Sequence, residues 1–330
     1  MIGLLVTVLK WLVALGIAAW LAMLLLDWIG PTEPVSLVPR FDATTIGDDP
    51  DAWLAERESQ VLNLRDNAAK EIVWAGEKGA RTDWAIVYLH GFSASKGELR
   101  PVPDQVAQAL GANLFLTRLS GHGRDGAAMA EPTVQDWVDD VAEAVAIGKR
   151  LGDKVVLIGT STGATLATIA AARPELNDAL AGVVLISPNY RPAGWAGRFI
   201  EWPWFRSWGP LVLGRERSWE PLNPEHGANW THTYPMQSVA PLGALTRTVR
   251  GLDFGAIRVP ALFLVSTTDT TIDTRIARRI AAEWGAPSEL VPVILGPNDD
   301  PNGHVLAGDI LSASRTAPVV ERIVAWIRGL

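Results

Sequence analysis

A serine between two glycines joins an apolar run to an Ala-rich stretch in Val155-Val156-Leu157-Ile158-Gly159-Thr160-Ser161-Thr162-Gly163. The apolar run has the length of a buried strand, and the Ala-rich stretch is typical of a helix. A serine on so tight a strand-to-helix turn has strained backbone angles, so the residues two before and two after it must be small. The turn raises the Ser161 hydroxyl above the sheet, in front of the helix N-terminus. The pattern predicts a nucleophilic serine, against the alternative of an ordinary glycine-rich turn.

Segments typical of strands and helices alternate on both sides of this turn. Apolar runs of strand length lie at residues 71–74, 84–89, 114–116, 155–158, 182–186, 261–265 and 290–295. Helices are expected at residues 53–64, 102–110, 134–151, 162–172, 274–284 and 318–327. Such alternation predicts an α/β fold with a mostly parallel, doubly wound sheet. Ligands of these sheets bind at the carboxyl ends of the strands, so the loops there are the candidates for chemistry.

A nucleophilic serine needs a general base. The chain has five histidines: His90, His122, His226, His232 and His304. His304 follows the last expected strand through a loop rich in Pro, Asn, Asp and Gly, so it is the best placed to reach Ser161; the alternative is a surface histidine that caps the final helix. The backbone beside His90 is a better candidate for hydrogen-bond donors than its imidazole, and His122 fits a structural turn. The remaining two lie in a Trp-rich insertion and need no special role.

The base in turn needs a carboxylate that orients it. Asp269 follows the apolar run 261–265 and a short polar segment. At that position its carboxylate could accept a hydrogen bond from the imidazole of the base and fix the tautomer of the ring. Asp273 fits better as the N-cap of the next helix. Asp299 and Asp300 rank below both, because they lie too close to His304 in sequence to reach its ring easily.

Ser161, Asp269 and His304 occur in the order serine, aspartate, histidine, each after a strand and before a helix. This order resembles the α/β-hydrolase superfamily over residues 72–327, and more narrowly its carboxylesterase and monoacylglycerol-lipase group. The resemblance is carried by His90-Gly91-Phe92, Arg118-Leu119-Ser120-Gly121-His122-Gly123, Gly159-Thr160-Ser161-Thr162-Gly163 and Gly303-His304.

The resemblance implies ester hydrolysis through an acyl-serine intermediate, with neither cofactor nor metal. It also implies an oxyanion hole formed by the backbone N–H groups of Phe92 and Thr162. Thr160 stands where such lipases often carry His, and Thr162 stands where Met, Gln or Leu is frequent, which leaves the subfamily open. A serine rather than an aspartate at this turn argues against dehalogenases and epoxide hydrolases.

An insertion of little regular alternation is expected at about residues 188–255, where the superfamily commonly holds a lid over the acyl pocket. Its tryptophans are Trp195, Trp202, Trp204, Trp208, Trp219 and Trp230. Trp side chains there could bury an acyl chain or lie at a lipid interface. For most of them, packing in the small core of the lid itself is the stronger expectation.

The first thirty residues are the strongest signal in the composition. From Ile2 to Leu26 the only charged side chain is that of Lys10. A helix over this segment is long enough to cross a hydrocarbon core of about 30 Å, with Trp11 and Trp28 at the two interfaces. The alternatives are a cleaved signal peptide, whose apolar region would be unusually long, and a buried helix. Residues 1–30 are thus expected to be a transmembrane anchor.

Charge suggests the side on which the rest of the chain lies. The amino terminus and Lys10 are positive, whereas residues 27–58 hold eight acidic side chains against two arginines. The positive-inside rule then favours a cytoplasmic amino terminus and an extracytoplasmic catalytic domain. Residues 31–65 are expected to form a linker and the domain edge, and residues 66–330 the α/β-hydrolase domain with its lid.

Composition narrows the function further. A net charge of −7 without a basic stripe argues against nucleic-acid binding, and the absence of cysteine excludes disulfides and thiolate chemistry. The prediction is a membrane-anchored serine esterase or lipase that acts on a small-molecule or lipid-like ester. Two alternatives stay open: an amidase or peptidase that uses the same three residues, and a non-catalytic, membrane-tethered binding module.

Overall fold

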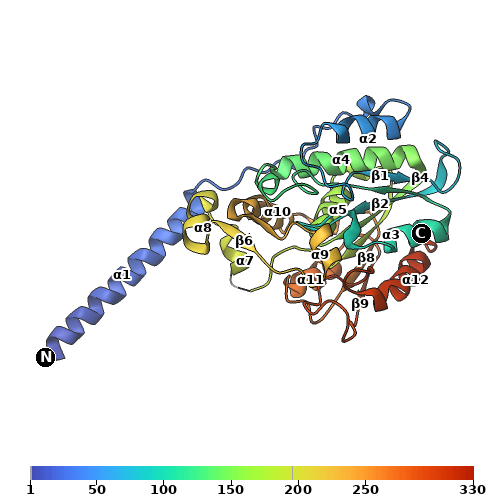
Figure 1. Ribbon diagram of the computed structural model, residues 1–330. Helices are drawn as coiled ribbons and strands as arrows, with labels where there is room; N and C mark the ends of the chain where they lie inside the picture. Colours follow the sequence, from blue (N-terminus) through green and yellow to red (C-terminus); the bar gives the residue numbers. More distant parts are fainter. Residues whose placement is uncertain (1, 195) are drawn as a thin grey trace.

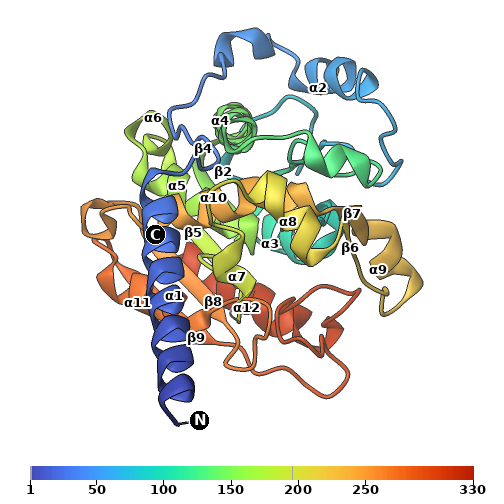
Figure 2. The ribbon, with the colours of Figure 1, turned by 90° about the vertical axis from the view of Figure 1, so that its left-hand side faces the viewer.

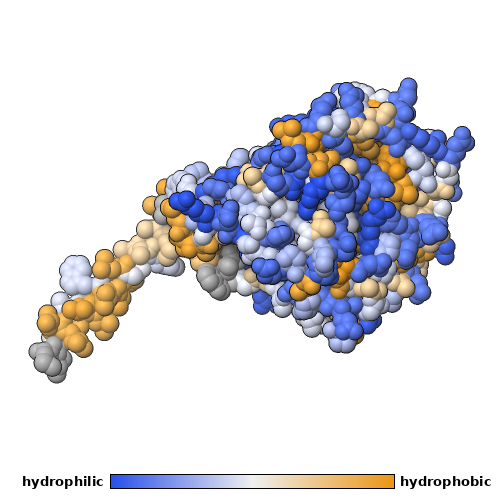
Figure 3. Space-filling model, in the orientation of Figure 1, coloured by the Kyte–Doolittle hydropathy of each residue, from blue (hydrophilic) through white to orange (hydrophobic). Residues whose placement is uncertain are grey.

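The computed structural model describes residues 2–194 and 196–330, without the side chains of residues 2, 26–28 and 196. One long helix, α1 (Ile2–Ile29), projects from one end of the folded body (Figure 1). Its described side chains are exposed, and the stretch Gly3–Leu25 is long and apolar enough to cross a membrane. Figure 3 shows apolar surface along this helix, in contrast to the largely hydrophilic body. A membrane anchor and a signal sequence both fit such a helix.

The two tryptophans expected at the membrane interfaces lie on this helix. Trp11 is exposed, whereas the side chain of Trp28 lies outside the described residues. Among the residues that the structure describes, none covers the apolar surface of Trp11 and its neighbours on the helix.

The described residues form a seven-stranded sheet in the order β1-β3-β2-β4-β5-β8-β9. The strands are β1 (Glu71–Val73), β2 (Thr82–Leu89), β3 (Asn113–Leu116), β4 (Gly152–Thr160), β5 (Leu180–Ile186), β8 (Ala261–Val265) and β9 (Ser288–Pro292). β1 pairs with β3 in the antiparallel sense, and every other neighbouring pair is parallel. The predicted α/β fold with a mostly parallel sheet is confirmed. The last strand begins two residues before the expected apolar run and ends before Leu295.

Helices cover both faces of the sheet. They are α3 (Val102–Leu110), α4 (Val134–Leu151), α5 (Thr162–Ala172), α6 (Pro174–Asn177), α11 (Thr274–Glu283) and α12 (Thr316–Ile327). Side chains of α4, α5 and α11 share one core with one face of the sheet, and those of α3 and α12 share a second core with the other face. Figures 1 and 2 show α4 and α12 on opposite sides of the sheet.

Burial on both faces explains the apolar runs in the sequence. Along β4, Val155 and Leu157 enter the core under α4, while Val156 and Ile158 enter the core under α12. A strand that is buried on both faces has no position for a polar side chain, so it reads as a continuous apolar run.

The segment after α1 packs on the body. Arg40 donates from Nη2 to Asp139 Oδ2 of α4 at 2.7 Å, and Ile46 is buried in the core on that face. The helix α2 (Pro50–Ser59) begins earlier than the expected 53–64, because the Asp49 side chain caps its first turn by accepting from Ala52 N.

Residues 187–260 join β5 to β8, and we call them the insertion. They hold α7 (Ala196–Phe199), α8 (Phe205–Leu213), β6 (Glu216–Ser218), α9 (Pro224–Asn229), β7 (Thr233–Pro235) and α10 (Val239–Val249). Strands β6 and β7 form a small antiparallel pair of their own. The start of α8 lies close to the segment that follows α1, because Trp204 N donates to Pro31 O at 3.0 Å (Figure 1).

Candidate active site

Ser161 lies on the turn between β4 and α5. Its backbone angles are φ 53° and ψ −115°, an uncommon conformation for a residue with a side chain. A Cβ atom on Gly159 would lie 2.6 Å from Ala164 N, and one on Gly163 would lie 2.0 Å from Leu89 O. The close approach of backbone on both sides explains why the turn needs glycine two residues before and two residues after the serine.

His304 and Asp269 meet although 35 residues separate them. Nδ1 of His304 lies 2.8 Å from Asp269 Oδ2, and the Asp269 side chain is fully buried. The other carboxylate oxygen, Oδ1, accepts from the backbone N–H groups of Thr271 and Ile272 at 2.8 and 3.1 Å. With its Nδ1–H donated to this fixed carboxylate, the imidazole presents Nε2 as a proton acceptor.

The charge around His304 favours the protonated ring. Burial is the largest single influence and lowers the pKa of His304, but the pKa is nevertheless raised above its ordinary value of 6.5, with the charge and the hydrogen bond of the Asp269 carboxylate as the largest raising influences. The charges of Glu98 and Asp300 act in the same direction. A base with a raised pKa is a stronger proton acceptor once it is neutral.

The other aspartates have different partners. Asp273 caps α11 by accepting from Arg275 N, as predicted. Asp300 Oδ2 accepts from the backbone N–H groups of His304 and Val305 at 3.0 and 2.8 Å, so it holds the loop and not the ring. Asp299 binds Gly296 N and the Ser314 hydroxyl. Among the four, only Asp269 hydrogen-bonds the imidazole.

Ser161 and His304 line the same cavity, of about 770 Å³. Within the part of the chain that the structure describes, Ser161 Oγ makes no hydrogen bond to the His304 ring. Contacts between a nucleophile and its base are often long in the free enzyme and tighten when the substrate binds.

Two backbone N–H groups beside Ser161 have no hydrogen-bond acceptor among the residues described. Thr162 is the first residue of α5, so its N–H has no partner within the helix. The N–H of Phe92, in the loop after β2, is free as well. Phe92 and Ser161 line the same cavity, where backbone N–H groups without a partner could stabilise a negative charge.

Residues 86–309 match a family model described as the alpha/beta hydrolase family. The chain belongs to the alpha/beta hydrolase family. The match begins within β2, ends in the loop after His304, and includes Ser161, Asp269 and His304. No curated protein sequence matches the chain.

Solved structures show the same fold. A structure from work on LipS and LipT, two metagenome-derived lipolytic enzymes, is 20% identical with a TM-score of 0.63 and covers 81% of this chain and 100% of that chain. The monoacylglycerol lipase of Paleococcus ferrophilus is 17% identical with a TM-score of 0.53, and the match covers 78% and 97%. Est1E of Butyrivibrio proteoclasticus with bound ferulic acid is 14% identical with a TM-score of 0.55, and the match covers 79% and 94%. Family and fold together support a hydrolase.

One histidine of this alpha/beta hydrolase links two of its loops, and a second lies beside it with ring centroids 5.1 Å apart. His90 Nδ1–H donates to Gly91 O at 2.8 Å, and His90 Nε2 accepts from Leu119 N at 3.0 Å. Burial lowers the pKa of His90 well below its usual value and that of His122 to about 4, so both rings are neutral. Both ring nitrogens of His90 have backbone partners, so its imidazole is not available to Ser161.

The insertion covers the cavity of this hydrolase. Trp219 and Trp230 line it, whereas Trp202 and Trp208 contact each other, with ring centroids 6.3 Å apart; Trp195 lies outside the described residues. His226, for which the sequence suggested no role, also lines the cavity and packs between these two lining tryptophans.

Sequence reasoning missed Glu98, a buried carboxyl group in the wall of the cavity. Its Oε2 accepts from Gly91 N at 2.6 Å and from the Tyr88 hydroxyl at 2.9 Å. Burial raises the pKa of Glu98 to about 7. In the sequence Glu98 stands in a polar loop beside Lys96 and Gly97, a context typical of a solvated side chain, so no local signal distinguishes it.

Proposed function

We propose that this alpha/beta hydrolase is a serine esterase or lipase with Ser161 as nucleophile, His304 as general base and Asp269 as the orienting acid. The observation that carries the proposal is the Asp269–His304 hydrogen bond of 2.8 Å at a cavity that Ser161 also lines. Nothing in the reaction calls for a metal or an organic cofactor.

The reaction follows from the geometry in two halves. His304 Nε2 takes the proton of Ser161 Oγ as this oxygen attacks the acyl carbonyl, and the Asp269 carboxylate stabilises the imidazolium. The imidazolium then protonates the leaving alcohol, which leaves the acyl group on Ser161. In the second half His304 takes a proton from water as the water attacks the acyl-serine, and the imidazolium returns this proton to Ser161 Oγ as the acid is released.

The free N–H groups of Phe92 and Thr162 suit an oxyanion hole for both tetrahedral intermediates. They stand beside the nucleophile, and that of Thr162 lies at the positive end of α5. Loss of one oxyanion donor typically lowers kcat about 10²- to 10³-fold.

The wall of the cavity suits the acyl part of a lipid-like ester. Its apolar lining from the insertion includes Ile200, Leu213, Met236, Val239 and Leu242. Burial of such a chain is favourable by about 0.8 kcal/mol per methylene. The lipolytic activity and the monoacylglycerol lipase named for two of the similar structures are consistent with this substrate class.

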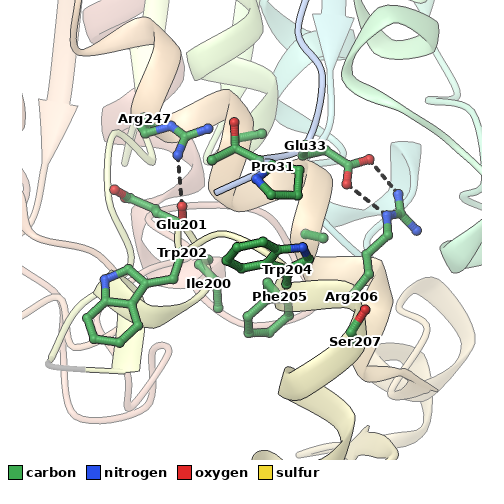
Figure 4. A pocket seen from close by; sticks show the side chains of 13 residues that line it. Pro31, Glu33, Ile200, Glu201, Trp202, Trp204, Phe205, Arg206, Ser207 and Arg247 are labelled. Atoms are coloured by element: carbon green, nitrogen blue, oxygen red, sulfur yellow. Dashed lines mark hydrogen bonds and ion pairs between the residues drawn. The ribbon is translucent and has the colours of Figure 1, made fainter. Parts of the chain in front are cut away.

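Contacts join the insertion to the segment after α1 and bring it close to the end of the proposed membrane anchor. Figure 4 shows a small pocket where the two meet, with Pro31 and Glu33 facing Trp204 and Arg206. Trp204 N donates to Pro31 O at 3.0 Å, and Arg206 donates from Nε and Nη2 to the Glu33 carboxylate at 2.8 and 2.6 Å. These contacts would hold the insertion at the membrane surface, where lipid-like esters are concentrated. On the charge argument the catalytic domain is extracytoplasmic.

A covalent probe and a substrate series test this function. A fluorophosphonate should label Ser161 of the folded chain, and the purified protein should hydrolyse p-nitrophenyl esters faster than an aminoacyl anilide. Ser161→Ala should lower kcat at least about 10⁴-fold while leaving the melting temperature nearly unchanged. No adduct on the folded protein would favour a binding module, and faster anilide turnover would favour an amidase or peptidase.

A further inference from the structure

Glu98 is a carboxyl group that the proposed reaction does not use. It ends a short turn of 3-10 helix (Lys96–Glu98), and only 2% of its surface is exposed. Both hydrogen bonds described above reach the same oxygen, Oε2, one from Gly91 in the loop after β2 and one from Tyr88 within that strand. The carboxyl group therefore ties the end of a central strand to the loop that follows it.

The carboxyl group lies against the same glycine as the nucleophile. A Cβ atom on Gly91 would lie 2.6 Å from Glu98 Oε1 and 3.2 Å from Ser161 Cβ. Gly91 is thus enclosed between Glu98 and Ser161, and its lack of a side chain lets the loop pass between them.

The two polar groups of Gly91 are both fixed. Its N–H donates to Glu98, and its C=O accepts from His90 Nδ1–H at 2.8 Å and from Ala94 N at 3.3 Å. The C=O of Gly91 and the N–H of Phe92 belong to one planar trans peptide unit, so they point in opposite directions. A fixed Gly91 carbonyl therefore leaves the Phe92 N–H aimed to the other side.

We propose that Glu98 is a positioning residue for the oxyanion hole: its carboxyl oxygen fixes Gly91 and thereby the direction of the Phe92 N–H. The inference rests on the proposed hydrolase function. It assigns Glu98 an effect on the transition state, where the oxyanion forms, and little effect on substrate binding.

The hydrogen bonds require an oxygen and not a charge. The pKa of about 7 means that the group changes its protonation state near neutrality, but a carboxylic acid protonated on Oε1 still offers Oε2 as an acceptor. A glutamine side chain can place its carbonyl oxygen in the same position. Leucine fills similar space without any acceptor, and leaves the Gly91 N–H unpaired.

The test compares Glu98→Gln and Glu98→Leu in the full-length chain in detergent, with p-nitrophenyl butyrate as substrate. We expect Glu98→Leu to lower kcat about 10- to 100-fold with KM within threefold, since loss of a whole donor typically costs about 10²- to 10³-fold. Glu98→Gln should lose no more than about threefold. Glu71→Gln is the matched control: Glu71 pairs with Lys96 of the same turn but lies outside the cavity, so kcat should stay within about twofold.

A third variant keeps the test decisive if Glu98→Leu fails to fold. Tyr88→Phe removes one of the two hydrogen bonds to Oε2, and it should lower kcat about two- to fivefold without raising KM. If the wild type is active and folded Glu98→Leu and Tyr88→Phe have the same kcat as the wild type, the role of Glu98 is overturned. A rise in KM with kcat unchanged would overturn it as well. Loss of kcat in Glu98→Gln as large as in Glu98→Leu would overturn it too. A folded wild type with no ester turnover would instead overturn the proposed function.

Discussion

The floor and the roof of the cavity are built by different interactions. The floor consists of Ser161, Asp269, His304 and the Gly91–Phe92 loop, which all follow strands of the sheet. Hydrogen bonds to backbone groups fix them: Ser161 N donates to Ile186 O at 2.9 Å, and two amides hold Asp269. The roof is the insertion, and it meets the cavity mainly with apolar and aromatic side chains.

This difference suggests that the floor controls the rate of the reaction and the roof controls the selectivity among substrates. Hydrogen bonds have narrow limits of distance and angle, so they can hold reacting groups in one arrangement. Apolar packing is less directional, and the roof can change shape while the floor keeps its geometry. We therefore expect changes in the floor to lower turnover on all substrates, and changes in the roof to alter the preference among them.

The strongest test of the floor is Asp269→Asn. An asparagine keeps the shape of the side chain but can donate a hydrogen bond to Nδ1, which favours the wrong tautomer of His304. The loss in kcat should approach the roughly 10⁴-fold seen for the equivalent change in a serine protease. Steady-state kinetics on a short ester measure it, with Asp273→Asn as control, because Asp273 caps α11 and pairs with Arg275 but makes no hydrogen bond to His304. Equal losses in the two variants would exclude the proposed role of Asp269.

The pH dependence of kcat/KM should show that the charges of Asp269 and Glu98 act on the pKa of His304. His304 must be neutral to accept a proton, so kcat/KM should fall about tenfold for each pH unit below its pKa. Because Asp269 and the neighbouring charges of Glu98 and Asp300 together raise this pKa despite burial, we expect the midpoint in wild type to lie above 6.5. Asp269→Asn should move the midpoint to lower pH, and Glu98→Gln should move it the same way by less. A midpoint that stays in place in Asp269→Asn would contradict this.

The floor could be predicted from the sequence because each of its parts carries a local signal. The glycines around Ser161 mark a strained turn, the apolar run 261–265 places Asp269 at a strand end, and the loop rich in Pro, Asn and Gly precedes His304. The parallel sheet then brings these strand ends to one edge. The pairing of Asp269 with His304 follows from the topology of the sheet and needs no detail of packing.

Glu98 and the roof could not be predicted in the same way. The contact of Glu98 with Gly91 depends on how one turn folds back onto β2, and a buried glutamate looks like an exposed one in sequence. In the insertion, Trp219 and Trp230 reach the cavity while Trp202 and Trp208 do not, although all four stand in similar surroundings. Which tryptophan faces which way is decided by tertiary contacts and not by periodicity.

A pair of substitutions on α8 tests the roof. Leu213 lines the cavity, whereas Leu211, two residues away, is 82% exposed. Leu213→Trp should fill acyl space and lower kcat/KM for a long-chain ester about tenfold, equivalent to roughly two methylenes, with short esters within threefold. Leu211→Trp should change neither. Kinetics on esters from two to sixteen carbons measure the shift; an equal loss at every chain length would mean that Leu213 affects the floor.

The smallest effect is expected where the roof meets the segment after α1. Arg206 and Glu33 form a two-pronged pair that is partly exposed, and such pairs contribute about 0–1 kcal/mol. Arg206→Met should therefore lower the melting temperature by only about 2 °C and leave soluble-ester kinetics within twofold. Lys149→Met, which breaks an exposed pair with Asp178 on the body, is the control for a lost surface charge. If the insertion is held at the membrane by this pair, Arg206→Met alone should lower turnover of an ester embedded in vesicles, two- to threefold. Equal turnover of the embedded ester by the two variants would show that the insertion keeps its position at the membrane without the Arg206–Glu33 ion pair.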